Sequence, residues 1–283
     1  MHSRRWLTAL VVLPLLLLVL LKGGRLGLVL VILVVSALAQ WEFLGMFRPE
    51  APKFQRLKSI LLGSMLLLSF CMAYPYSDKI CYPGGLLPCS TNAVLFILFW
   101  CTFTLFLFYL LSYGHIEELA QDLAVNILGL VYLPFLLGHF IWLRYLPQGE
   151  LWVLWLLLVI FAGDTGAFYV GQALGETKLY PQVSPGKTWA GAVGGVVLAL
   201  AAGLLAGNWL LPELSRRTQG VLAFVLALIG MLGDLFESML KRQTQVKDAS
   251  HLLPGHGGML DRLDSLLFAA PVLVYFRVFL LRG

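Results

Sequence analysis

Long apolar runs separated by short polar stretches dominate this sequence of 283 residues. Each run approaches the roughly 20 apolar residues that an α-helix needs to cross a hydrocarbon core about 30 Å thick. The pattern predicts nine membrane-spanning helices, near 6–21, 26–47, 60–76, 93–113, 123–143, 150–170, 188–211, 219–239 and 263–281. Because these spans leave no room for a separate soluble part, we expect an all-α polytopic integral membrane protein with a single transmembrane domain over 1–283.

The composition agrees with a membrane protein. Hydrophobic residues make up 59% of the chain and charged residues 12%, whereas soluble domains are about 45–50% apolar and about 25% charged. The net charge of +5 is ordinary for a membrane protein with basic loops. No basic stripe with interleaved aromatic residues is present, so we do not expect a nucleic acid partner.

The start of the chain has some features of a secretion signal. Arg4 and Arg5 precede an apolar run, and Ala39 ends a small-residue stretch that resembles a signal-peptidase site. A cleavable signal has an apolar region of only about 7–15 residues. The stretch before Ala39 is much longer and contains Lys22 and Arg25. We therefore interpret the first two runs as a helical hairpin that stays in the protein.

The basic residues predict the orientation of the chain. Cytoplasmic loops of membrane proteins carry an excess of Lys and Arg, and a cytoplasmic N-terminus places 12 of the 20 Lys and Arg residues inside. These are Arg4, Arg5, Arg48, Lys53, Arg56, Lys58, Lys178, Lys187, Lys241, Arg242, Lys247 and Arg262. The same topology places the loop 77–92 outside, where a disulfide can persist. The sequence leaves open whether Cys81 and Cys89 form one.

Three carboxylates stand out within the predicted spans, where an ionisable side chain costs about 2.5–3.5 kcal/mol. Asp164 lies in the sixth span, and Asp234 and Glu237 lie in the eighth. With Ser238 and Lys241, the latter two follow the spacing i, i+3, i+4, i+7, which places all four on one helix face. An internal ion pair between Lys241 and either Asp234 or Glu237 would be a purely structural explanation of this pattern.

Four glycines on the seventh predicted span form small-xxx-small pairs, Gly191 with Gly195 and Gly203 with Gly207. Such pairs let two helix backbones approach closely in a membrane. They therefore predict a helix-packing face.

The most concentrated charge of the chain lies between the eighth and ninth predicted spans, in a stretch that we call the polar segment (238–264). It contains four bases, three aspartates and a turn rich in glycine. These residues are Lys241, Arg242, Lys247, Arg262, Asp248, Asp261, Asp264, His256, Gly257 and Gly258. For Asp261 and Asp264 alone, the favourable position of acidic residues at a helix N-terminus would be a sufficient explanation.

The connection between these two spans brings Asp234, Asp261 and Asp264 to the same face of the membrane. Clustered carboxylates repel one another unless a cation lies between them. Hard oxygen ligands without thiolates favour Mg²⁺ or a similar ion, and a second cation stays open. The N–H groups of Gly257 and Gly258, ahead of a helix, would form an anion cradle. Phosphate groups would contact Lys241, Arg242, Lys247 and Arg262.

A second polar cluster lies between the sixth and seventh predicted spans, on the same side of the membrane. It comprises Asp164, Lys178 and the run Ser184-Pro185-Gly186-Lys187-Thr188. A lysine, two hydroxyls and a helix N-terminus suit phosphate binding, although Ser-Pro-Gly is a common turn and Thr a common N-cap. The run lacks the GxxxxGK[ST] spacing of a P-loop. Asp164 would be either a further metal ligand or a residue that orients Lys187.

The polar segment resembles the signature of the phosphatidate cytidylyltransferases, also called CDP-diacylglycerol synthases. The matching residues are Ser238-x-Leu240-Lys241-Arg242, then Lys247-Asp248-x-Ser250, then Leu253-Pro254-x-His256-Gly257-Gly258-Met259-x-Asp261-Arg262-Leu263-Asp264. Upstream, Asp164-Thr165-Gly166-Ala167 and Ser184-Pro185-Gly186-Lys187-Thr188-Trp189 resemble further parts of that family in the same order. The resemblance covers about 150–281, which would be the catalytic half.

This resemblance implies that CTP and phosphatidate react to give CDP-diacylglycerol and pyrophosphate at the cytoplasmic face of a bacterial inner membrane. Metal ions and cationic side chains would neutralise the two anionic reactants. The catalytic residues would be Asp234, Lys241, Arg242, Asp261 and Arg262, and the metal ligands Asp234, Asp261 and Asp264. Substrate contacts would be Asp164, Ser184, Lys187, Thr188, Lys247, Asp248, His256, Gly257 and Gly258. His256 would be either structural or a phosphate donor.

Two other classes of function stay open. One is a CTP-dependent enzyme that acts on a polyprenol or another lipid phosphate. The other is an ion-coupled transporter, although the sequence has no pair of interrupted helices repeated between its halves. A CDP-alcohol phosphotransferase is disfavoured because its DGxxAR-type motif is absent. The sequence leaves both a monomer and a homodimer open.

Overall fold

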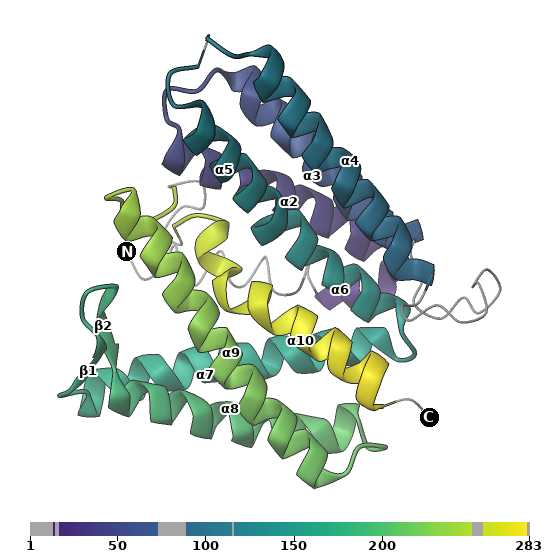
Figure 1. The fold of residues 1–283 in the computed structure, drawn as a ribbon. Coiled ribbons are helices and arrows are strands. Elements are labelled where there is room, and N and C mark those ends of the chain that lie inside the picture. Colours follow the sequence, from purple (N-terminus) through teal and green to yellow (C-terminus); the bar gives the residue numbers. More distant parts are fainter. Residues whose placement is uncertain (1–13, 15–16, 73–88, 115, 251–256, 282–283) are drawn as a thin grey trace. The chain divides into compact units, whose positions relative to one another are not determined.

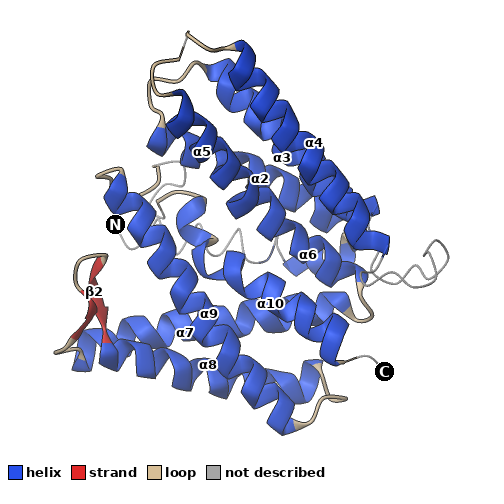
Figure 2. Ribbon diagram, in the orientation of Figure 1, coloured by secondary structure: helices blue, strands red, loops and turns tan. Residues whose placement is uncertain are grey.

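A computed structural model describes residues 14, 17–72, 89–114, 116–250 and 257–281. Helices make up most of this part of the chain (Figure 2), which confirms the all-α class. The chain divides into two compact units. The first comprises Met1–Leu146 with Asp248–Leu260, and the second comprises Pro147–Lys247 with Asp261–Gly283.

Seven helices in the described part of the chain are long and apolar enough to cross a membrane. They are Gly24–Phe47, Lys53–Met72, Ala93–Leu111, Leu119–Tyr145, Gly149–Leu174, Trp189–Leu210 and Arg216–Gln243. Each overlaps one predicted span, so the protein is a polytopic membrane protein. Most of the predicted span 6–21 lies outside the described residues, and 263–281 corresponds to a helix of 17 residues. The count of nine and the cytoplasmic N-terminus therefore stay predictions, and the side chains of Cys81 and Cys89 lie outside the described residues.

The first unit is a group of helices packed around an apolar interior. Its elements are α2 (Gly24–Phe47), α3 (Lys53–Met72), α4 (Cys89–Leu111), α5 (Leu119–Leu130), the π-helical turn η2 (Val131–Phe135) and α6 (Leu136–Tyr145). Pro134 lies within η2, where a proline removes a backbone donor and the regular α-helical bonding is interrupted. Fully buried Phe70 packs against Trp142 with the ring centroids 4.7 Å apart.

The second unit contains four helices and a short hairpin. The helices are α7 (Gly149–Leu174), α8 (Trp189–Leu210), α9 (Arg216–Gln243) and α10 (Asp264–Leu280). Strands β1 (Lys178–Tyr180) and β2 (Ser184–Thr188) pair in an antiparallel hairpin between α7 and α8 (Figure 1). The sequence predicted a turn in this loop but not the paired strands.

Helices α7 and α8 approach one another along a line of glycines. A Cβ atom added at Gly195 would lie 2.9 Å from the carbonyl oxygen of Gly163, and one at Gly166 would lie 2.6 Å from the carbonyl oxygen of Gly194. Real Cβ atoms essentially never come this close to a backbone atom. The backbones therefore touch directly, as the small-xxx-small pairs predicted.

We expect Gly166→Ala to destabilise the second unit by about 1–3 kcal/mol, the usual cost of overpacking a well-packed interior. The new methyl group can be accommodated only if the backbones of α7 and α8 separate. The matched control is Gly186→Ala on the hairpin, because an added Cβ there meets no atom within 4 Å. Thermal unfolding in detergent measures the effect, and equal unfolding temperatures for the two variants would contradict the prediction.

Candidate functional site

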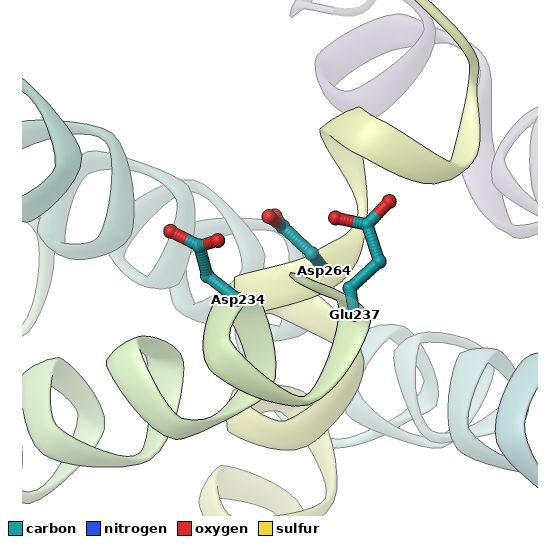
Figure 3. Close-up of side chains that lie close together, drawn as sticks. All are labelled: Asp234, Glu237 and Asp264. Atoms are coloured by element: carbon teal, nitrogen blue, oxygen red, sulfur yellow. The ribbon is translucent and has the colours of Figure 1, made fainter. Parts of the chain in front are cut away.

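Three carboxylates from two helices of the second unit form a compact group. Asp234 and Glu237 lie one turn apart on α9, and Asp264 is the first residue of α10. Each offers an oxygen, and these oxygens all lie within 4.8 Å of one another. Figure 3 shows the three side chains extending from the two helices toward a common region. We call these three residues the carboxylate group.

The donor chemistry of the carboxylate group fits a metal ion. All of its ligand atoms are hard oxygens, which suit Mg²⁺, Ca²⁺ or Mn²⁺ better than softer metals. Glu237 is 1% exposed, and its Oε1 atom has no hydrogen-bond partner among the described residues. A buried polar atom without a partner is costly, and a cation would satisfy it. This group could therefore bind a metal ion.

Lys241 partly balances the negative charge next to this group. Its Nζ atom lies 3.0 Å from Oε2 of Glu237 and 2.7 Å from Oδ1 of Asp261. Asp261 belongs to the short 3₁₀ helix η3 (Leu260–Arg262), which precedes α10. The lysine thus ties the end of α9 to the residues that lead into α10.

A second cation approaches the carboxylate group from the hairpin. The Nζ atom of Lys187, on β2, lies 2.7 Å from Oδ2 of Asp234. Both side chains keep some solvent exposure, 22% for Lys187 and 33% for Asp234. Asp234 therefore joins the group on α9 and α10 to the hairpin.

Beside Asp234 lies a cavity of about 720 Å³ within the second unit. This volume is in the usual range of small-molecule sites. Its polar lining includes Asp164, Lys178, Ser184, Lys187, Thr188 and Asp234. Much of the remaining wall is the glycine-rich surface of α7 and α8, including Gly163, Gly171, Gly191 and Gly195. Asp164 has Asp234 and Lys187 among its charged neighbours.

Local hydrogen bonds fix the hairpin that carries Ser184 and Lys187. Thr188 is the N-cap of α8, and its Oγ1 accepts from the backbone N–H of Gly191 at 3.1 Å. At the turn, Nε of Arg242 donates to the carbonyl oxygen of Val183 at 3.1 Å. The cap holds one end of the hairpin and the arginine of α9 holds the other.

The structure brings together much of the predicted site. Asp164, Ser184, Lys187 and Thr188 line one cavity with Asp234, and Asp234 and Asp264 belong to one carboxylate group. Asp261 is not a member of that group and pairs with Lys241 instead. The roles of Asp261 as a metal ligand and of Lys241 and Arg242 in phosphate binding stay predictions.

The remaining predicted residues are divided between the two units. Arg262 is in η3 and counts among the charged neighbours of Asp164. Lys247 is the last residue of the longer of the two chain segments that form the second unit. Asp248, Gly257 and Gly258 belong to the first unit, and His256 lies outside the described residues. Gly257 has a φ of +77°, a left-handed conformation that favours glycine. The substrate contacts proposed for these residues stay predictions.

Two buried carboxylates, Glu237 and Glu42, were not among the predicted site residues. Glu237 was interpreted only as an ion-pair partner, although its spacing from Asp234 places both on one face of α9. The other carboxylate is Glu42 on α2. It lies inside the predicted span 26–47 and is 4% exposed, so the rule that flags ionisable residues within a membrane span would have found it.

The fold and the site define a polytopic membrane protein with a cavity lined by carboxylates, a lysine pair and hydroxyls. The chain matches the model of the Cytidylyltransferase family over residues 3–280 and belongs to that family.

Several relatives share substantial sequence with this chain. It is 32% identical over 256 residues to a phosphatidate cytidylyltransferase of Bacillus subtilis, a match that covers 89% of each chain. It is 42% identical over 138 residues to a phosphatidate cytidylyltransferase of Haemophilus influenzae, covering 47% of this chain and 48% of the relative. It is also 42% identical over 154 residues to the uncharacterized protein YnbB of Escherichia coli, covering 52% of this chain and 51% of the relative. The matches to the latter two thus span about half of their length.

Proposed function

We propose that this protein transfers a cytidylyl group from CTP to phosphatidate, giving CDP-diacylglycerol and pyrophosphate. The family and the names of its relatives support this reaction class. The observation that carries the proposal is the position of Asp234, which belongs to the carboxylate group and also lines the cavity. A metal-binding carboxylate and a cavity with cationic walls are what a reaction between two phosphate esters requires.

In this reaction a phosphate oxygen of phosphatidate attacks the α-phosphorus of CTP. The new bond joins this oxygen to the α-phosphorus. At the same time the bond between the α-phosphorus and the oxygen that bridges to the β-phosphate breaks, and pyrophosphate leaves with that bridging oxygen. The attacking oxygen is already ionised, so no strong general base is needed. Lys178 and Lys187 would attract the phosphates of CTP, and the Ser184 hydroxyl would donate to them.

Asp234, Glu237 and Asp264 would hold Mg²⁺. Asp261 would be a further ligand, and the site could also take a second cation. Mg²⁺ usually takes one or two carboxylates and completes its shell with water and substrate phosphates. When bound there, it would neutralise charge that builds up on the phosphate groups. The three carboxylates and the cavity belong to one unit of one chain, so the proposal holds for a monomer and for a homodimer.

We further propose that the reaction takes place at the cytoplasmic face of a bacterial inner membrane. The relatives are bacterial proteins. The excess of basic residues in the loops predicted to be cytoplasmic supports this orientation, and CTP is a cytoplasmic nucleotide.

Purified protein incubated with CTP, Mg²⁺ and a panel of lipid phosphates tests the proposed function. We expect pyrophosphate and CDP-diacylglycerol with phosphatidate, and loss of both when the metal is removed by a chelator. Activity with a polyprenyl phosphate and none with phosphatidate would instead support the other lipid substrate. Ion flux in proteoliposomes without pyrophosphate release would support a transporter.

A further inference from the structure

Glu42 is a buried carboxylate of α2 that binds the polar segment. It is 4% exposed. Its Oε1 atom accepts from the hydroxyl of Ser250 at 2.6 Å and from the backbone N–H of Met259 at 2.9 Å. Its Oε2 atom accepts from the backbone N–H of Leu260 at 2.9 Å. Both oxygens of one side chain thus contact residues more than 200 positions away along the sequence.

These contacts differ from those of another buried acid in the same unit. Asp122 is 2% exposed and forms an ion pair with Arg48. Among the described residues, the three donors to Glu42 are uncharged: one hydroxyl and two backbone N–H groups. A carboxylate that accepts neutral donors forms charge-assisted hydrogen bonds with strict directions, so it constrains the backbone that donates to it.

The two backbone donors stand at the beginning of η3. The first N–H groups of a helical turn have no partner within the helix, and Glu42 accepts from the N–H of Leu260, the first residue of η3, and of Met259, the residue before it. The carboxylate therefore acts as a cap supplied from a distant helix. The next residue along the chain is Asp261, and Asp264 follows three positions later.

We propose that Glu42 is a positioning residue for the proposed reaction. It fixes the backbone at Met259 and Leu260, and thereby the point at which the chain enters η3 and continues to Asp261, Arg262 and Asp264. The same oxygen that holds Met259 also holds Ser250, so two separate parts of the polar segment depend on one side chain. Only the activity measurement below rests on the proposed function.

The variant that tests this role is Glu42→Gln, which keeps the size of the side chain and removes its charge. One oxygen becomes an NH₂ group, which cannot accept from a backbone N–H. We expect amide hydrogen exchange at Met259 and Leu260 to accelerate about tenfold or more, because a buried hydrogen bond is lost. We expect kcat to fall by about 10- to 100-fold through misplacement of the following residues, with the KM for CTP changed less than about threefold.

Four further variants make the test specific. Glu50→Gln makes the same chemical change at an exposed position of the same unit and should match the wild type. Ser250→Ala removes one donor and leaves the two backbone donors, so its effect should be smaller. The double variant Glu42→Gln/Ser250→Ala should fall short of the sum of the two effects, because both residues belong to one hydrogen-bond network. Glu42→Asp retains the charge on a shorter side chain and should recover part of kcat.

Wild-type amide exchange at Met259 and Leu260 in Glu42→Gln would overturn the proposal. It would also be overturned if exchange accelerated equally in α7 and α8, since that would indicate a general loss of stability. If Glu42→Gln does not fold, unchanged exchange at Met259 and Leu260 in both Ser250→Ala and Glu42→Asp would overturn it. A wild-type protein without activity on CTP and phosphatidate would refute the proposed function, and the exchange measurement would still decide the role of Glu42.

Discussion

Asp234→Asn is expected to lower kcat by about 1000-fold or more. Asp234 is a member of the carboxylate group, lies 2.7 Å from Lys187 and lines the cavity. Asparagine keeps the size of the side chain but removes the charge that both a metal ion and Lys187 require. A loss of about 4 kcal/mol of transition-state stabilisation corresponds to this factor. Initial rates with CTP and phosphatidate, measured across a Mg²⁺ titration, give the result.

The control for this prediction is Glu213→Gln, which removes a carboxylate from an exposed position of the same unit. It should keep the activity of the wild type. An Asp234→Asn protein with more than a tenth of the wild-type kcat at the same Mg²⁺ concentration would show that Asp234 is not needed for the chemistry.

Lys241→Met is expected to abolish activity and also to destabilise the protein by about 3 kcal/mol. Lys241 is the cation between Glu237 and Asp261, whose side chains are 1% and 10% exposed. Removing one partner of a buried ion pair leaves uncompensated charge and typically costs about 3–5 kcal/mol. Methionine fills a similar volume, so the loss of charge dominates. Thermal unfolding in detergent and the CTP assay measure the two effects.

A double variant separates the two effects of Lys241→Met. Without Lys241, the carboxylates of Glu237 and Asp261 both lose their cation. In Lys241→Met/Glu237→Gln the first of them is neutral, so much of the lost stability should return. Activity should stay low, because Glu237 is a member of the carboxylate group. Unfolding of Lys241→Met at the wild-type temperature would refute the electrostatic role of this lysine.

The sequence predicted most of the helices because the length of an apolar run is a direct requirement of the bilayer. Each of the seven described spans overlaps a predicted one, and the glycine pairs at Gly191 and Gly203 correctly indicated packing faces. The hairpin of β1 and β2 was not predicted, because strands of 3 and 5 residues are too short to show an alternating pattern of apolar and polar residues. Its pairing depends on tertiary contacts, such as the one from Arg242, that no local pattern reveals.

The candidate site was predictable where spacing along one helix decides the geometry. Asp234 and Glu237 share a face of α9 because they are three residues apart. Asp261 and Asp264 have the same spacing, yet only Asp264 joins the carboxylate group. The reason is that the chain changes from the 3₁₀ helix η3 to α10 between them. Their side chains therefore do not lie on one α-helical face, and Asp261 forms an ion pair with Lys241.

The glycine-rich wall of the cavity has a consequence for how its packing can change. At Gly191 and Gly195 an added Cβ would lie within 3.0 Å of a carbonyl oxygen of α7, so a substitution there would push the two helices of this wall apart. At Gly163 an added Cβ would meet Ala199 at 3.5 Å, an ordinary contact. A single methyl group at that position would fit between α7 and α8 without altering any charged residue. The packing of this wall and the charges that line the cavity can thus be changed separately in this scaffold.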